Sequence, residues 1–350
     1  MARLIEPWLA VAVARRFTGE DQLQNSYLID RLYRDLEGAV PRAEELVAEA
    51  SGIPAPPPVR WGVIDRARWV EANVAGMTRL IGPLGDKLAK RLETVPLPVR
   101  IAQRAALSIE VGVLLGYVSR RVLGQYDLLV PEDDIASPSL YFVGPNMVET
   151  ERRHGFIPEE FTLWVAVHEV THRFQFDGVP WLRPRFLELV HSYVGALELD
   201  AKGLAQRLAQ AGRRLMSKGT PIGERNPIYL LASDEQRAML DEIQALMAVV
   251  EGHGNYVMDS VGEQVIPSFR QMRHVFQRRR EQTSRMQRAL NHAIGLEMKM
   301  RQYEVGQRFC EVVVSREGPQ ALAQLWTDPD QFPSMAELRE PERWLRRVAA

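Results

Sequence analysis

Cysteine is nearly absent from this chain: Cys310 is the single cysteine among 350 residues. One thiol cannot form an intramolecular disulfide, and it cannot supply the several thiolates of a cysteine-rich zinc site. Any metal in this protein must therefore be held by histidine and carboxylate side chains. So little cysteine also fits a reducing compartment, and we expect a cytoplasmic protein.

The chain also lacks an excess of charge of either sign. Its 44 basic and 45 acidic residues give a formal net charge of -1 and a pI near 6.7. Such a balance offers no general attraction to nucleic acid, which we do not expect as a partner. The glycine-rich motifs that bind dinucleotides, or that form phosphate-binding loops, are absent as well. With 46% hydrophobic residues, the chain has the composition and length of one large or two modest globular domains.

Long hydrophobic runs are missing too. The apolar run Trp8–Ala14 is too short for a secretory signal or a membrane span. The most apolar long window, residues 101–118, is interrupted by Arg104 and Glu110. This interruption favours a buried helix over a membrane span. Gly112 and Gly116 within it are four residues apart, which predicts close helix packing in a soluble core.

What the chain does contain is the pattern H-E-x-x-H, as His168-Glu169-Val170-Thr171-His172. Residues four apart lie one turn above each other on the same face of a helix, so His168 and His172 can reach a single metal ion. Glu169 then stands beside that ion as a base. Two histidines satisfied by hydrogen bonds in a helical core are the alternative. Burying these polar groups on an otherwise apolar helix costs free energy, and binding to a metal ion is the simpler way to offset that cost.

Helical spacing of apolar residues dominates the rest of the chain, and Pro54–Pro58 is the clearest linker in the first half. Short apolar and aromatic runs at 126–130 and 140–143, framed by prolines, indicate strands. The strand at 140–143 either exposes an edge to an extended peptide or belongs to a small hairpin that covers the core. The helices are expected at 1–50, 66–75, 76–93, 99–124, 158–176, 184–215, 233–251, 268–282, 285–314 and 319–326.

Catalytic zinc sites use three protein ligands, so one ligand remains to be found. The metzincin continuation H-E-x-x-H-x-x-G-x-x-H is excluded, because Gln175 and Gly178 stand where that pattern needs Gly and His. The third ligand must come from further along the chain. The candidates are Glu188, His191, Glu198, Asp200, Glu251, His253 and Asp259.

Glu251 is the preferred third ligand. It follows a helical apolar run at the border of a buried face, where an unpaired carboxylate would be costly. The flanking Gly252 and Gly254 would let this helix approach the metal helix closely, although an ordinary helix end at Glu251 and Gly252 is the alternative. Glu198 and Glu188 remain the next candidates. His253 and Asp259 could orient an imidazole, and His253 and Tyr256 are the candidate catalytic groups that stabilise an oxyanion.

Four segments together resemble a bacterial family of zincin-like metallopeptidases. They are His168–Phe176, Glu251–Asp259, Lys299–Tyr303 and the ending Leu325–Pro329. The resemblance implies a mainly α fold with a small β-sheet (α+β) and one Zn²⁺ ion. It covers the chain from about residue 130. We therefore expect an N-terminal helical region at 1–125 and a zincin-like region at 126–350, packed as one compact unit. Some members of the family are associated with biosynthesis of a deazaflavin coenzyme.

These patterns predict a zinc-dependent hydrolase, most simply a metallopeptidase that cleaves a peptide or small amide substrate with activated water. Glu169 is the general base, and the metal ligands are His168, His172 and Glu251. Two other functions remain open: a zincin-like scaffold that binds metal without catalysis, and a small-molecule amide hydrolase in cofactor metabolism.

Overall fold

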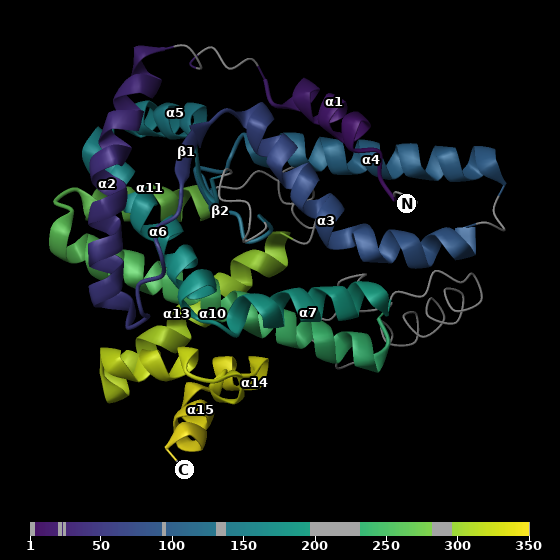
Figure 1. Ribbon diagram of the computed structural model, residues 1–350. Helices are drawn as coiled ribbons and strands as arrows, with labels where there is room; N and C mark the ends of the chain where they lie inside the picture. The colour runs from purple at the N-terminus through teal and green to yellow at the C-terminus, as the bar shows by residue number, and fades with distance from the viewer. Residues whose placement is uncertain are drawn as a thin grey trace. The chain divides into compact units, whose positions relative to one another are not determined.

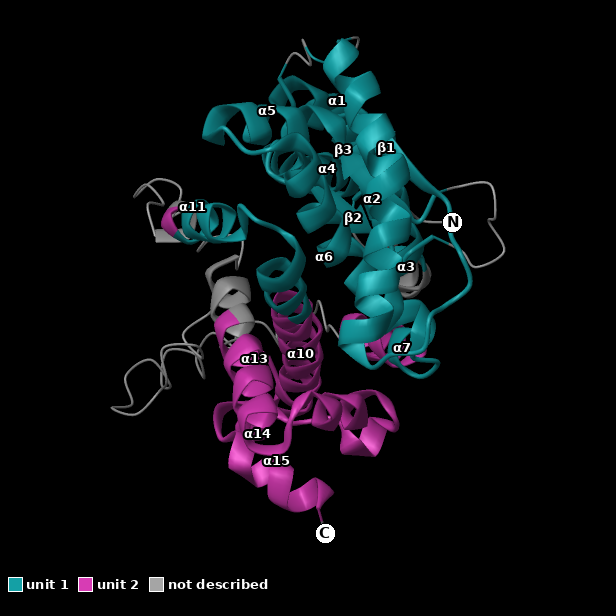
Figure 2. Cartoon of the chain, turned by 90° about the vertical axis from the view of Figure 1, so that its left-hand side faces the viewer, with its two compact units in different colours: residues 1–183, 257–277 teal, residues 184–256, 278–350 magenta. Residues whose placement is uncertain are grey.

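The computed structural model describes residues 4–19, 23, 26–92, 96–130, 138–196, 232–281 and 296–349, with the backbone alone at 83–92, 279–281 and 296–303 (Figure 1). The fold is mainly helical with one small sheet, as the sequence predicts. Two compact units make up the chain. Unit 1 comprises residues 1–183 and 257–277, and unit 2 comprises residues 184–256 and 278–350 (Figure 2). Residue 125, where we expect the N-terminal region to end, lies inside unit 1.

Unit 1 surrounds the sheet with helices. Two expected helices, at 66–75 and 76–93, are one continuous helix, because Gly76 does not interrupt it. Pro41 likewise stands inside a helix of 25 residues. The helices of this unit are α1 (Pro7–Phe17), α2 (Tyr27–Ser51), α3 (Arg66–Leu92), α4 (Leu97–Ser119), α5 (Gly144–His154), α6 (Pro158–Gly178) and most of α11 (Phe269–Glu281).

The sheet has three short strands in the order β1-β3-β2. β3 (Leu140–Val143) is confirmed where the sequence predicts it, and it is fully buried. It pairs in parallel with β1 (Trp61–Ile64) and antiparallel with β2 (Gly124–Tyr126). The prediction of an exposed edge at 140–143 is therefore wrong, because β3 has a neighbour on each side. β2 begins and ends earlier than the predicted strand at 126–130, and it forms one edge of the sheet.

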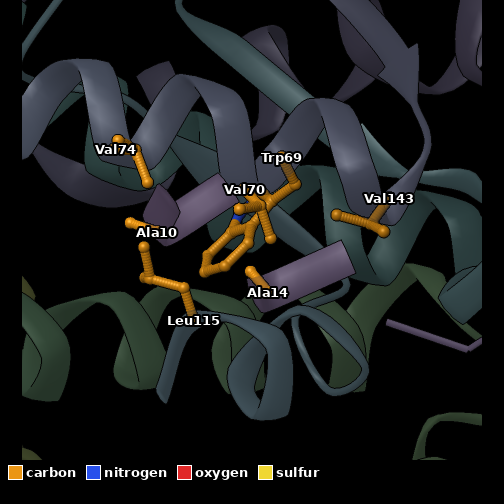
Figure 3. Close-up of a cluster of buried hydrophobic side chains, with 7 residues drawn as sticks. All are labelled: Ala10, Ala14, Trp69, Val70, Val74, Leu115 and Val143. Atoms are coloured by element: carbon orange, nitrogen blue, oxygen red, sulfur yellow. The ribbon is translucent and has the colours of Figure 1, made fainter. Parts of the chain in front are cut away.

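A cluster of apolar side chains joins α1, α3, α4 and the end of β3 (Figure 3). Trp69 fills its centre, and the indole Nε1 donates a hydrogen bond of 2.7 Å to Gln125 of β2. The predicted close packing at Gly112 and Gly116 is also found. A Cβ atom added at these glycines would lie 2.6 Å and 2.7 Å from backbone oxygens of α1. The members of the cluster are Ala10, Ala14, Trp69, Val70, Val74, Leu115 and Val143.

The helix predicted within 101–118 exists as part of α4, but the prediction that it is buried is wrong for one side. Its inner side, including Ser108 and Leu115, is buried. Ile101 and Ile109 are 57% and 45% exposed. By length and composition α4 is the one helix among the described residues that could cross a membrane, with a mean hydropathy of 1.3. A single such helix does not establish a membrane span.

The proline-rich segment at 54–58 packs inside unit 1 and does not connect two units. Arg173 of α6 is 1% exposed, and it donates hydrogen bonds to the carbonyl oxygens of Pro56 and Pro57. The same guanidinium pairs with Glu44 of α2. A buried cation requires such partners. These bonds attach the extended segment to the helix that carries the H-E-x-x-H motif.

Unit 2 is built on α10 (Asp234–Val265), which extends into unit 1 from Val257. Ser233 and Gln236 cap its start reciprocally, as predicted. The expected end of this helix at 251–259 is wrong, because α10 continues without a break to Val265. In the described part of unit 2, the other helices are α7 (Leu182–Gly195), which starts at the end of unit 1, α13 (Leu296–Glu317), η2 (Pro319–Trp326), η3 (Pro329–Gln331), α14 (Met335–Arg339) and α15 (Pro341–Val348).

Gly252, which follows Glu251, packs closely against α13. A Cβ atom added at Gly252 would lie 2.2 Å from the carbonyl carbon of Gly306 in α13. The close packing at Gly252 is thus with α13. The expected approach of α10 to the metal helix stays a prediction. Parts of the helices predicted at 184–215 and 285–314 lie outside the described residues, as do Glu198 and Asp200.

Candidate metal centre

The motif lies on α6, whose start is encoded locally. Pro158 occupies the first turn, where its missing N–H costs nothing, and Glu159 and Glu160 favour the helix dipole. Most of the helix beyond the first turn is buried, including Val167 and Val170 on either side of the first histidine and the glutamate. The surrounding apolar packing fixes α6 rigidly. His168 and His172, which are only partly buried, are therefore held on a rigid element.

The two imidazoles meet one turn apart on α6. Their Nε2 atoms are 3.2 Å apart, and their ring centroids are separated by 4.6 Å. The Nδ1 atom of His172 lies 2.9 Å from Oε1 of Gln175. An amide oxygen only accepts, so this bond places the imidazole hydrogen on Nδ1 and leaves a lone pair on Nε2. Gln175 is completely buried, which keeps it in place.

Glu169 points toward the edge of the sheet. The side chain is 7% exposed, and its Oε2 atom accepts a hydrogen bond of 3.2 Å from the backbone N–H of Tyr126 in β2. The Tyr126 hydroxyl in turn donates to Asp177, further along α6. Burial, and then the Asp177 carboxylate, raise the pKa of Tyr126 well above its usual value, so the phenol stays protonated.

Glu251 on α10 is the candidate third ligand. One ligand atom from each of His168, His172 and Glu251 lies within 4.8 Å of the others. The other described candidates have different surroundings. Glu188 pairs with Arg185 at an exposed position, and Asp259 pairs with Arg273 at 3.1 Å. His191 is exposed.

The predicted catalytic groups His253 and Tyr256 share α10 with Glu251. At about 100° per residue, His253 and Tyr256 are about 160° and 140° around the helix from Glu251. His253 is completely buried, and its ring packs edge-on against Trp326 with a centroid distance of 4.9 Å. Burial, and then the neighbouring Cys310, raise the pKa of Tyr256. A catalytic role for His253 or Tyr256 stays a prediction.

The donor set fits zinc. Tetrahedral zinc binds imidazole nitrogen at about 2.0–2.1 Å, which places two such nitrogens about 3.3 Å apart. The observed separation of 3.2 Å agrees with that geometry. Two imidazoles and one carboxylate are also a ligand set of catalytic zinc sites, which keep a fourth position for water or substrate.

Three contributors to this site are not among the residues predicted from the sequence. Gln175 departs from the metzincin pattern, and its place three residues after His172 puts it within reach on the same helix face. Gly124 and the backbone N–H of Tyr126 contact Glu169 from a strand far away in the sequence. A contact between residues so far apart in the sequence cannot be predicted from a local sequence pattern.

A mainly helical fold that places H-E-x-x-H on a buried helix beside a small sheet defines a zincin-type protein. The family model for zincin-like metallopeptidases matches residues 5–345, so the chain belongs to the zincin-like metallopeptidase family. This membership covers the N-terminal region too, beyond the range that the four sequence segments indicate. It supports a zinc hydrolase in general terms.

The chain is also similar to a solved structure. A crystal structure from Chloroflexus aurantiacus, of a protein proposed to be a hydrolase and described as having a novel fold, shares 32% sequence identity with it. The alignment covers 99% of each chain, with a TM-score of 0.70. No curated protein matches the chain.

Proposed function

We propose that this protein is a zinc-dependent hydrolase that cleaves a peptide or amide bond. The observation that carries the proposal is the pair of Nε2 atoms of His168 and His172, 3.2 Å apart, with Glu169 on the same helix. Membership of a metallopeptidase family supports the peptide bond as the substrate class. The scarcity of cysteine supports a cytoplasmic location.

His168, His172 and Glu251 are the proposed ligands of one zinc ion. When bound, zinc supplies Lewis acidity, which polarises a carbonyl group and lowers the pKa of bound water to about 7. The hydrogen bond to Gln175 orients the His172 ring and keeps its Nε2 lone pair available for the metal.

Glu169 has the role of general base and then general acid. Its carboxylate takes a proton from the attacking water and passes it to the leaving amine. Oε2 of this carboxylate accepts the Tyr126 N–H, which holds the side chain beside β2. Tyr256 and His253 are proposed as supporting polar groups. The protonated phenol of Tyr256 is suited to donate a hydrogen bond to a developing oxyanion.

The test compares the wild-type protein with Glu169→Gln on a panel of peptides and small amides, with a chelator and with zinc restored. The wild type should cleave at least one member, and the activity should depend on zinc. Glu169→Gln should keep zinc and lose turnover by about 10²–10⁴-fold. Equal hydrolysis by the variant would contradict the mechanism.

The same panel separates the rival functions. A scaffold without catalysis would bind zinc and cleave nothing. A hydrolase of cofactor metabolism would leave the peptides intact and act on small amides from a metabolite extract.

A further inference from the structure

In the edge strand β2, every second residue has its backbone N–H and C=O groups pointing away from the neighbouring strand β3. In the antiparallel pair, the N–H of Asp127 donates to Ser139 at 2.7 Å, and the N–H of Val143 donates to Leu123 at 2.8 Å. Bonded positions alternate along an antiparallel pair. The backbone N–H and C=O groups of Gly124 and Tyr126 therefore point away from β3, toward the open side of the sheet.

That open side meets Glu169. The N–H of Tyr126 donates to Oε2 of this carboxylate at 3.2 Å. β2 is also attached to α6 a second time, because the Tyr126 hydroxyl donates to Asp177 and its ring stacks on Phe176 with a centroid distance of 6.0 Å. The strand is thus fixed to the metal helix at both the glutamate and the C-terminal end of the helix.

Gly124 makes room for the glutamate side chain. A Cβ atom at this position would lie 2.6 Å from Cγ of Glu169 and 2.9 Å from its Cδ and Oε1 atoms. These separations are far shorter than van der Waals contact, so any other residue forces Glu169 to move. Because Glu169 is only 7% exposed, little free space remains around it. The requirement for glycine comes from this contact, since the Gly124 backbone is an ordinary strand.

We propose that Gly124 and the backbone N–H of Tyr126 form a cradle that positions the Glu169 carboxylate. Gly124 sets where the side chain can lie, with Oε1 beside this glycine, and the Tyr126 N–H holds Oε2. A general base must be held in its productive geometry, since a misplacement of about 1 Å can cost about 100-fold in rate. This catalytic consequence rests on the proposed function, whereas the cradle itself does not.

The cradle is tested by amide hydrogen exchange at Tyr126. In the wild type this N–H should be protected, although it points away from the neighbouring strand. Gly124→Ala and Glu169→Ala should each accelerate its exchange roughly ten-fold, as expected for the loss of one hydrogen bond. Gly62→Ala is the matched control, because a Cβ atom at this glycine of β1 meets Pro138 at an ordinary 3.6 Å. Unchanged exchange at Tyr126 in both variants would overturn the proposal.

Turnover supplies the second measurement. Gly124→Ala should retain the zinc content of the wild type and its KM, and kcat should fall about 100-fold. The shorter side chain of Glu169→Asp does not reach the new methyl group. In a Glu169→Asp background, Gly124→Ala should therefore lower kcat much less than it does in the wild type. If Gly124→Ala is fully active while Glu169→Gln is inactive, the positioning role of Gly124 is refuted and the proposed function stands. A wild type that hydrolyses nothing would refute the proposed function, and the exchange data would still decide on the cradle. If Gly124→Ala does not fold, exchange in Glu169→Ala decides.

Discussion

At the scale of single residues, helix periodicity predicts the histidine pair, but it does not predict every residue that positions the site. Spacing of four predicts that His168 and His172 share a helix face, and the structure has their Nε2 atoms 3.2 Å apart. The contact of Gln175 with His172 depends on the same periodicity and could have been predicted. The contact of Gly124 with Glu169 could not, because glycine has no side-chain pattern and its neighbour is brought close only by tertiary packing.

Removing the partner of His172 should weaken zinc binding. In Gln175→Ala, Nδ1 loses its acceptor, so the ring orientation and the lone pair on Nε2 are no longer fixed. We expect zinc affinity to fall about 10–100-fold, measured by competition with a chromophoric chelator. Gln175→Glu keeps an acceptor at the same place and should bind zinc nearly as well as the wild type. An unchanged affinity of Gln175→Ala would show that Gln175 does not orient the ligand.

At the scale of elements, the sequence predicts the long helices well and their ends and contacts less well. Periodicity and the cap at Ser233 reveal α10, but the glycines beside Glu251 suggest an end that the structure does not have. Tertiary packing overrides their low helix propensity, because Gly252 lets α13 approach closely. β1 is missed for a similar reason. A strand of four residues, Trp61–Ile64, is defined by its pairing with β3 and not by its own pattern.

The crossing of α10 and α13 gives a prediction about stability. A Cβ atom at Gly306 would lie 1.8 Å from the backbone oxygen of Ala248, so Gly306→Ala must push the helices apart. We expect a loss of about 1–3 kcal/mol or more, seen as a lower Tm by circular dichroism. Gly38→Ala is the control, because nothing lies within 4 Å of a Cβ atom at this exposed position in α2. It should raise stability by up to about 1 kcal/mol. Equal melting of Gly306→Ala and the wild type would argue against the close crossing.

At the scale of the whole molecule, the site depends on residues from distant parts of the sequence. Both histidines and Glu169 lie on α6, and the proposed third ligand, Glu251, lies on α10, about 80 residues further along the chain. The sequence alone selects Glu251 among several acidic residues only by its position beside a buried face. The close grouping of its ligand atom with those of His168 and His172 supports that choice.

The affinity of Glu251→Ala for zinc tests the central claim most directly. Glu242→Ala is the matched control, because Glu242 is a half-exposed carboxylate on the same helix that pairs with Arg185. We predict that Glu251→Ala binds zinc more than about 100-fold more weakly than the wild type, beyond the loss expected for a residue that only orients a ligand. Glu242→Ala should bind like the wild type. A Glu251→Ala variant that binds one zinc ion with wild-type affinity would contradict the account.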